Sequence, residues 1–387
     1  MDDTTLRLAF VDLAPHVGRA ARMMWELALG LPRDRFELHA WLSPDSGKDD
    51  LAAALEQTGV VIERVSAAAS GWDLKSRLGM WQRARKLKPQ LFHVHLEAGS
   101  DPALTARVVE GAGPTPLLLT LHEARVLEAA PSPAFRSLVA RAAVITVPCA
   151  HDGDQVVRRM GRERASVRVI PPGATLPDES EILAARRIRD ALGVRPGRPL
   201  WVAPLRLETG RGHDVLLRAL AEVHRRGLPF LAVLPGAGPL KPLLADTAES
   251  LGLAGLVSFD DAVDHLGPLL TAADAVIFPV MGGPIPFSLL DAMARERVVV
   301  ASDVPAVREA LAGGTAGRLV PTADPHALAD ALEMLHRRPG DAVLLGREAA
   351  RQVEETLRWE RVIDACEESY DEVLGLATFA PGEESRR

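Results

Sequence analysis

Residues 6–11, LRLAFV, followed by residues 20–29, AARMMWELAL, contain the pattern that decides the fold. The first stretch is a short apolar run, and in the second the apolar residues recur every three or four positions, as on one face of a helix. Because consecutive parallel strands need a crossover of about a dozen residues or more, repetition of this pair predicts a parallel, doubly wound α/β sheet. Further apolar runs follow at 36–42, 60–65, 91–95, 117–121, 144–147 and 167–170.

A break in this pattern lies at residues 171–180, PPGATLPDES, near the middle of the chain. The alternation then restarts, which predicts a second α/β domain. Its expected strands are 200–203, 230–234, 257–259, 275–278 and 298–301, with helices over 214–225, 241–251 and from 287 onward. The stretch 347–374 is expected to be helical, and 379–387 a frayed tail. The fold class is therefore two Rossmann-like parallel-sheet domains, whose ligands are expected at the carboxyl ends of the strands, between the domains.

Composition narrows the kinds of partner. The 387 residues carry a net charge of −7 and only 4% aromatic side chains, which disfavours a nucleic-acid partner and a base-stacking surface. Cys149 and Cys366 are too few for a disulfide framework or a cysteine-built metal site, although a bridge between them stays open. The acidic N-terminus does not resemble an export signal, so a cytoplasmic location is expected.

Two arginines follow the strand predicted at 200–203. Arg206 and Arg211 lie in LRLETGRGHD, residues 205–214, where glycines allow the chain to turn. Guanidinium groups at a strand's carboxyl end can converge on a diphosphate. The alternative interpretation is a pair of solvated arginines.

Two further loops occupy equivalent positions after strands. Gly236, Gly238 and Pro239 lie between a strand and a helix, where small residues let a ligand approach the main chain, although a glycine turn without ligand is the commoner meaning. The third loop, residues 279–286, leads into a helix that carries Asp291. This acid could accept hydrogen bonds from ribose hydroxyls, or it could be an ordinary acid near a helix N-terminus.

Together these motifs resemble the retaining GT-B glycosyltransferases of family 4. The resemblance rests on Arg206 with Arg211, on the loop 236–239, and on LLDAMA at 289–294 followed by VVVAS at 298–302. FHVH at 92–95, TLH at 120–122, VIPPG at 169–173, GRLVP at 317–321 and WER at 359–361 extend it over nearly the whole chain.

The resemblance implies how the chain is divided and what it does. It implies an N-terminal acceptor-side domain (1–172), a C-terminal nucleotide-sugar-binding domain (173–360) and a last helix returning to the first domain (361–387). The two main domains would face a central cleft. The implied activity is transfer of a sugar from a nucleotide-diphosphate sugar to an acceptor hydroxyl, with retention of configuration. The nucleobase, the sugar and the acceptor are not readable from the sequence.

Matching positions identify candidate site residues. Arg206 and Arg211, which stands where the family has lysine, would bind the donor diphosphate. Asp291 would hold the ribose, and His122 would face the donor sugar and phosphates. The residues expected to catalyse are therefore Arg206, Arg211, His122 and Asp291; those expected to bind the donor are Gly18, Gly236, Gly238, Pro239, Gly283, Ile285, Phe287, Ser288 and Leu289.

The donor loop departs from the family pattern. Gly283 stands eight residues before Asp291, where the family has a first glutamate that contacts the donor sugar. Pro284 and Pro286 remove two main-chain N–H donors. A non-catalytic relative that binds nucleotide or a glycan-assembly partner therefore stays open as a second hypothesis, and a nucleotide-sugar epimerase as a third.

Two other segments bear on cofactors and location. Asp152 and Asp154 open a predicted helix, where acids are favoured by the helix dipole, so no metal site and no cofactor beyond the nucleotide-sugar co-substrate are expected. The basic segment 74–88 carries Leu74, Leu78 and Trp81 at helical spacing. It is either a surface helix or a peripheral contact with the inner face of a membrane.

Overall fold

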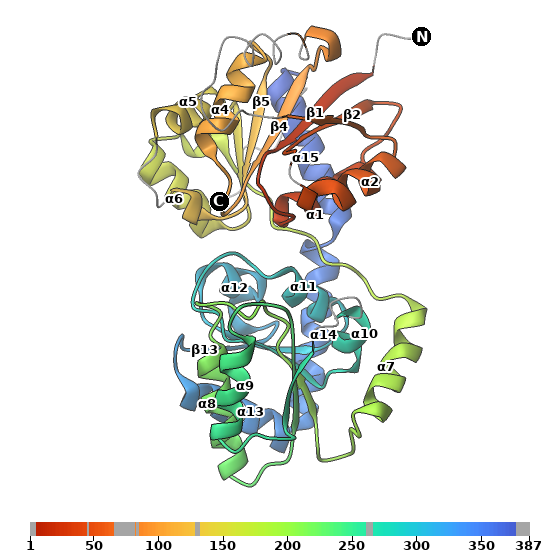
Figure 1. Ribbon diagram of the computed structural model, residues 1–387, viewed down its shortest axis with the longest axis vertical. Coiled ribbons are helices and arrows are strands. Elements are labelled where there is room, and N and C mark those ends of the chain that lie inside the picture. Colours follow the sequence, from red (N-terminus) through yellow and green to blue (C-terminus); the bar gives the residue numbers. More distant parts are fainter. Residues whose placement is uncertain are drawn as a thin grey trace, which may run out of the picture. The chain divides into compact units, whose positions relative to one another are not determined.

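The computed structural model describes residues 5–44, 46–65, 82, 85–127, 132–260 and 266–376. The chain divides into two compact units: unit 1 comprises residues 1–171 and 360–387, and unit 2 comprises residues 172–359. Each unit contains one parallel sheet with helices around it (Figure 1). Most of the basic segment 74–88, and the tail 379–387, lie outside the described residues.

The sheet of unit 1 has the order β3-β2-β1-β4-β5-β6-β7, and every neighbouring pair is parallel. This confirms the seven strands predicted for the first half. The strands are β1 (Leu6–Asp12), β2 (Phe36–Leu42), β3 (Val61–Arg64), β4 (Leu91–Leu96), β5 (Leu117–Leu121), β6 (Val144–Val147) and β7 (Val167–Val169). The helices include α1 (Arg19–Gly30), α2 (Asp49–Gln57), α4 (Pro102–Gly111), α5 (Pro133–Arg141), α6 (Ala150–Met160) and α15 (Trp359–Leu374).

The sheet of unit 2 has the order β10-β9-β8-β11-β12-β13 and is also parallel. Its strands are β8 (Leu200–Val202), β9 (Leu231–Pro235), β10 (Val257–Asp260), β11 (Ala275–Phe278), β12 (Val298–Ser302) and β13 (Arg318–Val320). Its helices include α7 (Glu179–Ala191), α8 (His213–Arg225), α9 (Lys241–Ser250), α10 (Leu266–Ala272), α11 (Phe287–Ala294), α12 (Pro305–Ala310), α13 (Pro325–Arg337) and α14 (Pro339–Thr356). β13 is additional to the five strands expected here.

The central strands are buried along their whole length. Every residue of β4, β5, β6, β11 and β12 is buried. Parallel sheets covered by helices on both faces produce such continuous apolar runs, which explains why the sequence reveals these strands clearly. The strand ends, where polar side chains begin, are therefore positioned by a rigid core.

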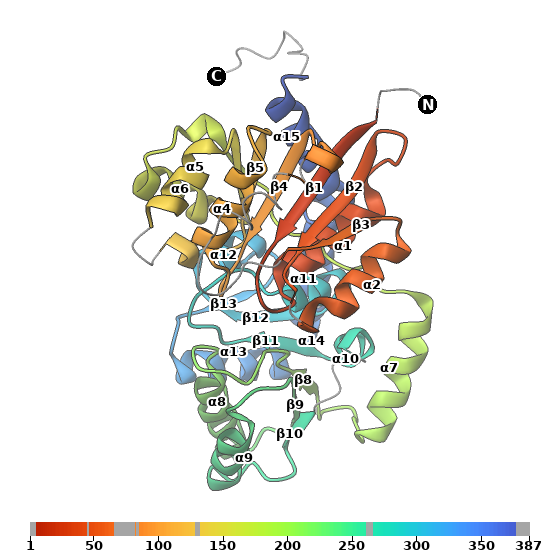
Figure 2. The ribbon, with the colours of Figure 1, turned by 45° about the horizontal axis from the view of Figure 1, so that its top comes forward.

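The predicted helix over 347–374 is two helices, α14 and α15, separated at Leu357 and Arg358. The linker crosses at this break: the backbone N–H of Ala174 donates to the carbonyl of Leu357 at 2.8 Å. A Cβ atom on Gly173 would come within 2.6 Å of the Trp359 indole, so only glycine fits there. The second helix then joins unit 1, where Figure 2 shows α15 beside the strands.

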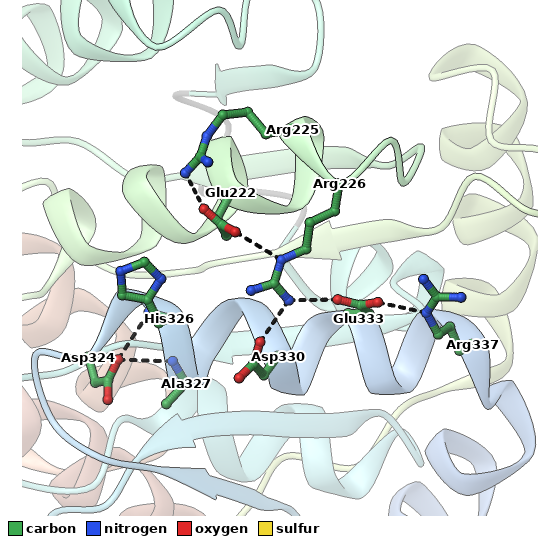
Figure 3. Close-up of polar contacts among 9 residues, drawn as sticks. All are labelled: Glu222, Arg225, Arg226, Asp324, His326, Ala327, Asp330, Glu333 and Arg337. Atoms are coloured by element: carbon green, nitrogen blue, oxygen red, sulfur yellow. Dashed lines mark hydrogen bonds and ion pairs between the residues drawn. The ribbon is translucent and has the colours of Figure 1, made fainter.

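Arg226, which follows α8, links that helix to α13 in unit 2 (Figure 3). Its Nη1 donates to Asp330 at 2.7 Å and to Glu333 at 2.6 Å, and its Nε donates to Glu222 at 3.0 Å. These bonds raise the pKa of Arg226 and lower the pKa of Glu333 and Glu222. The network holds two helices that cover the same sheet, away from the strand ends considered next.

Candidate functional site

Three loops meet at the carboxyl edge of the unit 2 sheet. The backbone N–H of Leu207, after β8, donates to the carbonyl of Ala237, after β9, at 3.1 Å. The N–H of Met281, after β11, donates to the carbonyl of Gly210 at 3.3 Å. The Ser288 hydroxyl donates to the carbonyl of Pro204 at 3.1 Å. The structure thus brings together the three segments that the sequence singled out separately.

Arg206 points into solvent from this edge. Its side chain is 69% exposed and its guanidinium lies 2.7 Å from a carboxylate oxygen of Glu208. Arg211 lies in the same loop, half-buried, and within the described part of the chain no hydrogen bond or ion pair engages its side chain. Both cations are thus placed where an anion could reach them.

His213, at the start of α8, is a residue that the sequence analysis did not identify. Its side chain is 3% exposed. Burial lowers the pKa of His213 to about 4, and Arg211 nearby contributes in the same direction. The imidazole is therefore neutral at pH 7, and the positive charge of this loop comes from Arg206 and Arg211.

The glycines of these loops are needed for close approach of the main chain. A Cβ atom on Gly236 would lie 2.6 Å from the carbonyl oxygen of Leu205, and one on Gly238 would lie 2.3 Å from that of Leu207. Gly212 has a φ of +75°, and a Cβ there would lie 1.8 Å from the carbonyl oxygen of Pro279. These contacts give Gly236 and Gly238 a structural reason besides their predicted role in donor binding. Pro239, which follows them, is exposed.

The loop before α11 has an unusual backbone. Gly282 and Gly283 have φ values of +150° and +97°, and a Cβ on Gly283 would meet no described atom within 4 Å. Ile285 and Leu289 are buried, at 1% and 0% exposure, so their side chains belong to the core, and their predicted role in donor binding stays a prediction. The half-buried Phe287 ring lies 6.2 Å from that of Trp359, between centroids.

Asp291 lies in the second turn of α11, close to the helix N-terminus as expected. Its Oδ1 accepts a 2.7 Å hydrogen bond from the backbone N–H of Thr175. Arg295 donates to the carbonyls of Thr175 and Asp291, and its guanidinium forms two bonds, of 2.7 and 2.9 Å, with Glu181. Asp291 therefore ties the linker to α11, and its predicted contact with ribose stays a prediction.

His122 lies at the carboxyl edge of the other sheet, in unit 1, directly after β5. It is 7% exposed, its Nε2 is 3.1 Å from Nδ1 of His95, and the two rings are stacked at 17°. Burial lowers the pKa of His95 to about 3, with a further contribution from Lys48. Burial, and then the neighbouring His95 and Arg19, hold the pKa of His122 well below its usual range. Both rings are neutral at pH 7.

A buried ion pair lies at the same edge, formed by Asp12 and Lys48, both 0% exposed. Burial raises the pKa of Asp12, and the Lys48 ammonium opposes that rise. Neither residue was predicted from the sequence. Asp12 carries a usable signal, because it is an acid directly after an apolar strand, whereas Lys48 sits in a short 3-10 turn (Ser46–Lys48) without any pattern.

The position of the Glu97 side chain explains why residue 18 is a glycine. The Glu97 side chain is 4% exposed, and its Oε2 accepts hydrogen bonds from the backbone N–H groups of Arg19 (2.6 Å) and Ala20 (3.3 Å), at the start of α1. A Cβ on Gly18 would lie 2.3 Å from the other carboxylate oxygen. Burial raises the pKa of Glu97. A carboxylate thus occupies the helix N-terminus, where an anionic ligand would otherwise bind.

Three sequence expectations concern metals, cysteines and membranes. Across the described ranges, no cluster of three or more His, Cys, Asp or Glu side chains could hold a metal ion; a metal-free reaction stays a prediction. Asp152 lies in the first turn of α6, as expected. Cys149 and Cys366 are free thiols, so the bridge left open by the sequence is not formed. In the part of the chain that is described, every helix is too short or too polar to cross a bilayer, and membrane contact through 74–88 stays a prediction.

Comparison with known proteins shows similarity to glycosyltransferases. Residues 20–176 match the family model described as Glycosyltransferase Family 4, and residues 198–338 match the one described as Glycosyl transferases group 1. The chain is similar to D-inositol 3-phosphate glycosyltransferase of Saccharomonospora viridis, at 31% identity over 73% of this chain and 70% of the relative. The same-named protein of Rhodococcus opacus is 31% identical over 62% of this chain and 56% of the relative.

The chain therefore spans little more than half the length of some of the curated relatives it matches. Among solved structures, Anabaena Alr3699/HepE in complex with UDP is similar in fold, with a TM-score of 0.79 at 19% identity, covering 95% of this chain and all of that one.

Proposed function

The chain belongs to the group 1 glycosyltransferases with the GT-B fold, and from this membership we propose that it moves a sugar from a nucleotide-diphosphate sugar to an acceptor hydroxyl. We propose retention of configuration and no metal ion. The observation that carries the proposal is the placement of Arg206 and Arg211 at the carboxyl edge of the unit 2 sheet, in a loop joined to the two loops that complete the candidate site.

The two arginines can supply positive charge next to the leaving diphosphate. When the bond between the sugar and the diphosphate breaks, negative charge develops on the diphosphate, and the acceptor oxygen forms the new bond as it loses its proton. Guanidinium groups positioned before the reaction stabilise this charge without a reorganisation cost. His122 is neutral at pH 7 and its Nε2 is engaged by His95, so its Nδ1 is the ring nitrogen that can form a hydrogen bond with a ligand without adding charge.

The donor and acceptor classes follow from relatives. A similar structure was crystallised with UDP, which favours a uridine diphosphate donor, and the curated relatives are named for D-inositol 3-phosphate, which favours a phosphorylated polyol acceptor. These identities are proposals for this chain, because it spans only part of several of those relatives.

A second candidate function is nucleotide binding without turnover, and Gly283 favours it. A φ of +97° strains any residue with a Cβ, so this loop is not a glutamate loop from which only the side chain has been removed. Substitution Gly283→Glu would place the acid on a backbone shape that disfavours it. If binding without turnover is correct, the loop has adapted to a different role.

A two-stage experiment separates these functions. First, UDP, GDP, ADP and their sugars are screened by thermal shift, because a ligand that binds the folded state raises the unfolding temperature. Second, the bound sugar nucleotide is incubated with inositol phosphates and other polyols, and the anomeric configuration of the product is read by proton NMR. Sugar transfer with retention supports the glycosyltransferase, and binding without product supports nucleotide binding without turnover. Absence of both binding and product contradicts both candidate functions.

Arginine substitutions locate the site within that experiment. We expect Arg206→Ala to abolish the UDP-dependent thermal shift while the protein remains folded, because the side chain is exposed. The matched control is Arg218→Ala, which removes an arginine of similar exposure (64%) from α8 and leaves the loop intact. Equal loss in the two variants would mean that bulk charge, rather than this site, attracts the nucleotide.

A further inference from the structure

A cavity of about 360 Å³ lies at the amino-terminal edge of the unit 2 sheet, opposite the candidate donor loops. Residues directly before three strands line it: Pro199 before β8, Asp274 before β11 and Arg297 before β12. The ends of α13 and α14 close it. Because the strands are parallel and three to five residues long, the two edges are separated by about 10–17 Å.

Arg297 is a cation in this cavity that forms no ion pair with any described residue. Its Nε donates to the carbonyl of Arg295 at 2.7 Å and its Nη1 to the carbonyl of Ala273 at 3.2 Å. These oxygens satisfy two N–H groups but carry no net charge. Of the carboxylates described, none forms an ion pair with the guanidinium, and Asp274 and Glu296 favour its charged form only through longer-range attraction. A half-buried charge is costly unless an opposite charge accompanies it, and burial lowers the pKa of Arg297.

Two more arginines line the same cavity. Arg189 donates to the carbonyl of Ala272 at 2.6 Å and to Asp274 at 3.1 Å, and Asp274 also accepts the backbone N–H of Leu200 at 2.7 Å. Asp274 is therefore already committed to protein partners.

Arg195 is held at the rim by the turn 195–198. The backbone N–H of Arg198 closes this turn onto the carbonyl of Arg195 at 2.9 Å. Pro196 and Gly197, with a φ of +79°, occupy the central positions that a type II turn favours. The Arg195 side chain is exposed and, within the described residues, makes no hydrogen bond or ion pair. The turn therefore fixes the backbone of Arg195 at the rim, and the free side chain can reach into the cavity.

The remaining lining combines polar and apolar groups. His336 Nδ1 is buried and finds no hydrogen-bond partner among the described residues. Leu335 and Val343 form apolar walls. Glu296 is the second acid of the lining and is exposed. The lining thus contains three arginines and two acids, and one of the acids, Asp274, already bonds to protein groups. The cavity volume falls within the range of small-molecule pockets.

We propose that this cavity is a second anion-binding site, whose ligand is a small phosphate monoester such as a sugar phosphate. Guanidinium groups match phosphate oxygens in bidentate geometry, and the apolar walls accept a carbon skeleton. The inference does not depend on the proposed transfer reaction, because it rests on residues at the other edge of the sheet. A ligand here stabilises unit 2 without occupying the candidate donor loops.

The test is isothermal titration calorimetry of the full chain with inorganic phosphate and with glucose 6-phosphate. We expect both probes to bind, and Arg297→Gln or Arg195→Gln each to weaken binding about 10- to 100-fold, as expected for loss of a charge-assisted hydrogen bond. Arg195 is exposed, so its variant keeps the test valid if Arg297→Gln fails to fold. Glu296→Gln should strengthen binding, because it removes the uncommitted acid.

Arg206→Ala separates this site from the candidate donor site. Glucose 6-phosphate should bind that variant as it binds the wild type. Loss of binding in Arg206→Ala with retention in Arg195→Gln would overturn the proposal, and so would the absence of heat with either probe. Binding of inorganic phosphate without glucose 6-phosphate would overturn the assignment to a phosphate monoester.

Discussion

Arg206 is the exposed cation of the candidate donor site, and Glu208 holds it in the free protein at 2.7 Å. A diphosphate must compete with that carboxylate for the same guanidinium. Because the pair is exposed, its own contribution is small, about 0.2–1 kcal/mol. We therefore expect Glu208→Gln to strengthen UDP binding by about two- to fivefold, measured by calorimetry.

The control for that variant is Asp214→Asn, which removes an exposed acid from the start of α8, paired with Arg218 rather than with Arg206. Asp214→Asn should change the affinity for UDP less than Glu208→Gln does. Weaker UDP binding in Glu208→Gln would mean that Glu208 positions Arg206 instead of competing for it.

Three buried histidines make folded unit 1 sensitive to acid, and the buried His213 acts in the same direction in unit 2. Burial lowers the pKa of His93, His95 and His122, that of His95 to about 3. Since the unfolded chain binds protons below about pH 6.5 and the folded chain does not, stability is lost as the pH falls through that value. Each histidine contributes up to about 1.4 kcal/mol per pH unit, so the three together approach about 4 kcal/mol per unit.

Asp12 and Glu97, whose pKa values are raised by burial, reduce this slope at lower pH. Urea unfolding at pH 7.5, 6.5 and 5.5 measures it. We expect the free energy of unfolding to fall by about 1 kcal/mol between the first two values and by about 3 kcal/mol between the second and the third. His122→Asn should flatten the fall by about one third, and equal stability at pH 7.5 and 5.5 would contradict the neutral histidines.

For single residues, the sequence indicates which side chains carry useful chemistry but does not show which residues they contact. Arg206 was identified because a charged residue after a buried strand is conspicuous. The partners of Gly18 and Asp291 were not, because Glu97 is 79 residues from Gly18 and Thr175 is 116 residues from Asp291. A glycine pattern cannot show whether its missing Cβ makes room for a ligand, for a carboxylate as at Gly18, or for main chain as at Gly238.

Among the elements, the loops of unit 2 depend on the close approach of Gly212 to the loop after β11. Gly212→Ala places a Cβ 1.8 Å from the Pro279 carbonyl oxygen and adds the strain of a φ of +75°. Gly210→Ala adds strain at a φ of +81°, but its Cβ meets no described atom within 4 Å. Comparison of the two variants therefore separates the cost of backbone strain from the cost of the steric clash with Pro279.

We expect Gly210→Ala to lower the free energy of unfolding by about 1–2 kcal/mol, the usual cost of the left-handed region. Gly212→Ala should lower it further and also weaken UDP binding, because main chain must move. Chemical denaturation of the two variants measures the difference. Equal destabilisation would show that the loops are not in contact in solution.

The buried strands were predictable from the sequence, whereas a short edge strand and one helix boundary were not. β11 and β12 are buried on both faces and read as apolar runs. β13 has three residues with an exposed arginine at its start, too short for any periodicity. The break between α14 and α15 was missed because it results from the linker residue Ala174 pairing there, a contact that the local sequence does not reveal.

At the scale of the whole molecule, the chain leaves unit 1 at the linker and returns to it with α15. Tyr370 is fully buried in unit 1; its ring packs edge-on against Phe36, and its hydroxyl lies 2.8 Å from Nδ1 of His93. Arg35 forms ion pairs with Glu367 and Asp371 of the same helix. The last helix is therefore part of the first unit's core.

We expect Tyr370→Ala to destabilise unit 1 by about 3–5 kcal/mol, as for other large buried aromatic residues, and to leave unit 2 nearly unchanged. Hydrogen exchange with mass spectrometry, read separately over the two sheets, measures this. Tyr370→Phe keeps the ring and should cost about 1 kcal/mol, the value of a hydrogen bond. Equal acceleration of exchange in both sheets would contradict the division into units.

Because the net charge is −7, any site for an anion on this chain must depend on a local group of cations. The structure identifies where the cations gather in unit 2: Arg206 and Arg211 at one edge of the sheet, and Arg189, Arg195 and Arg297 at the other. The first group was predictable from its position after a strand. The second was not, because its members are dispersed in sequence and only the parallel sheet aligns them.

The central claim is that this chain uses a nucleotide sugar through Arg206. Release of nucleoside diphosphate from a panel of nucleotide sugars, measured with an acceptor mixture present, tests it most directly. We expect release by the wild type, a decrease of about 10²- to 10³-fold in Arg206→Ala, and near-normal release in Arg218→Ala. Release at the same rate in Arg206→Ala as in the wild type would contradict it.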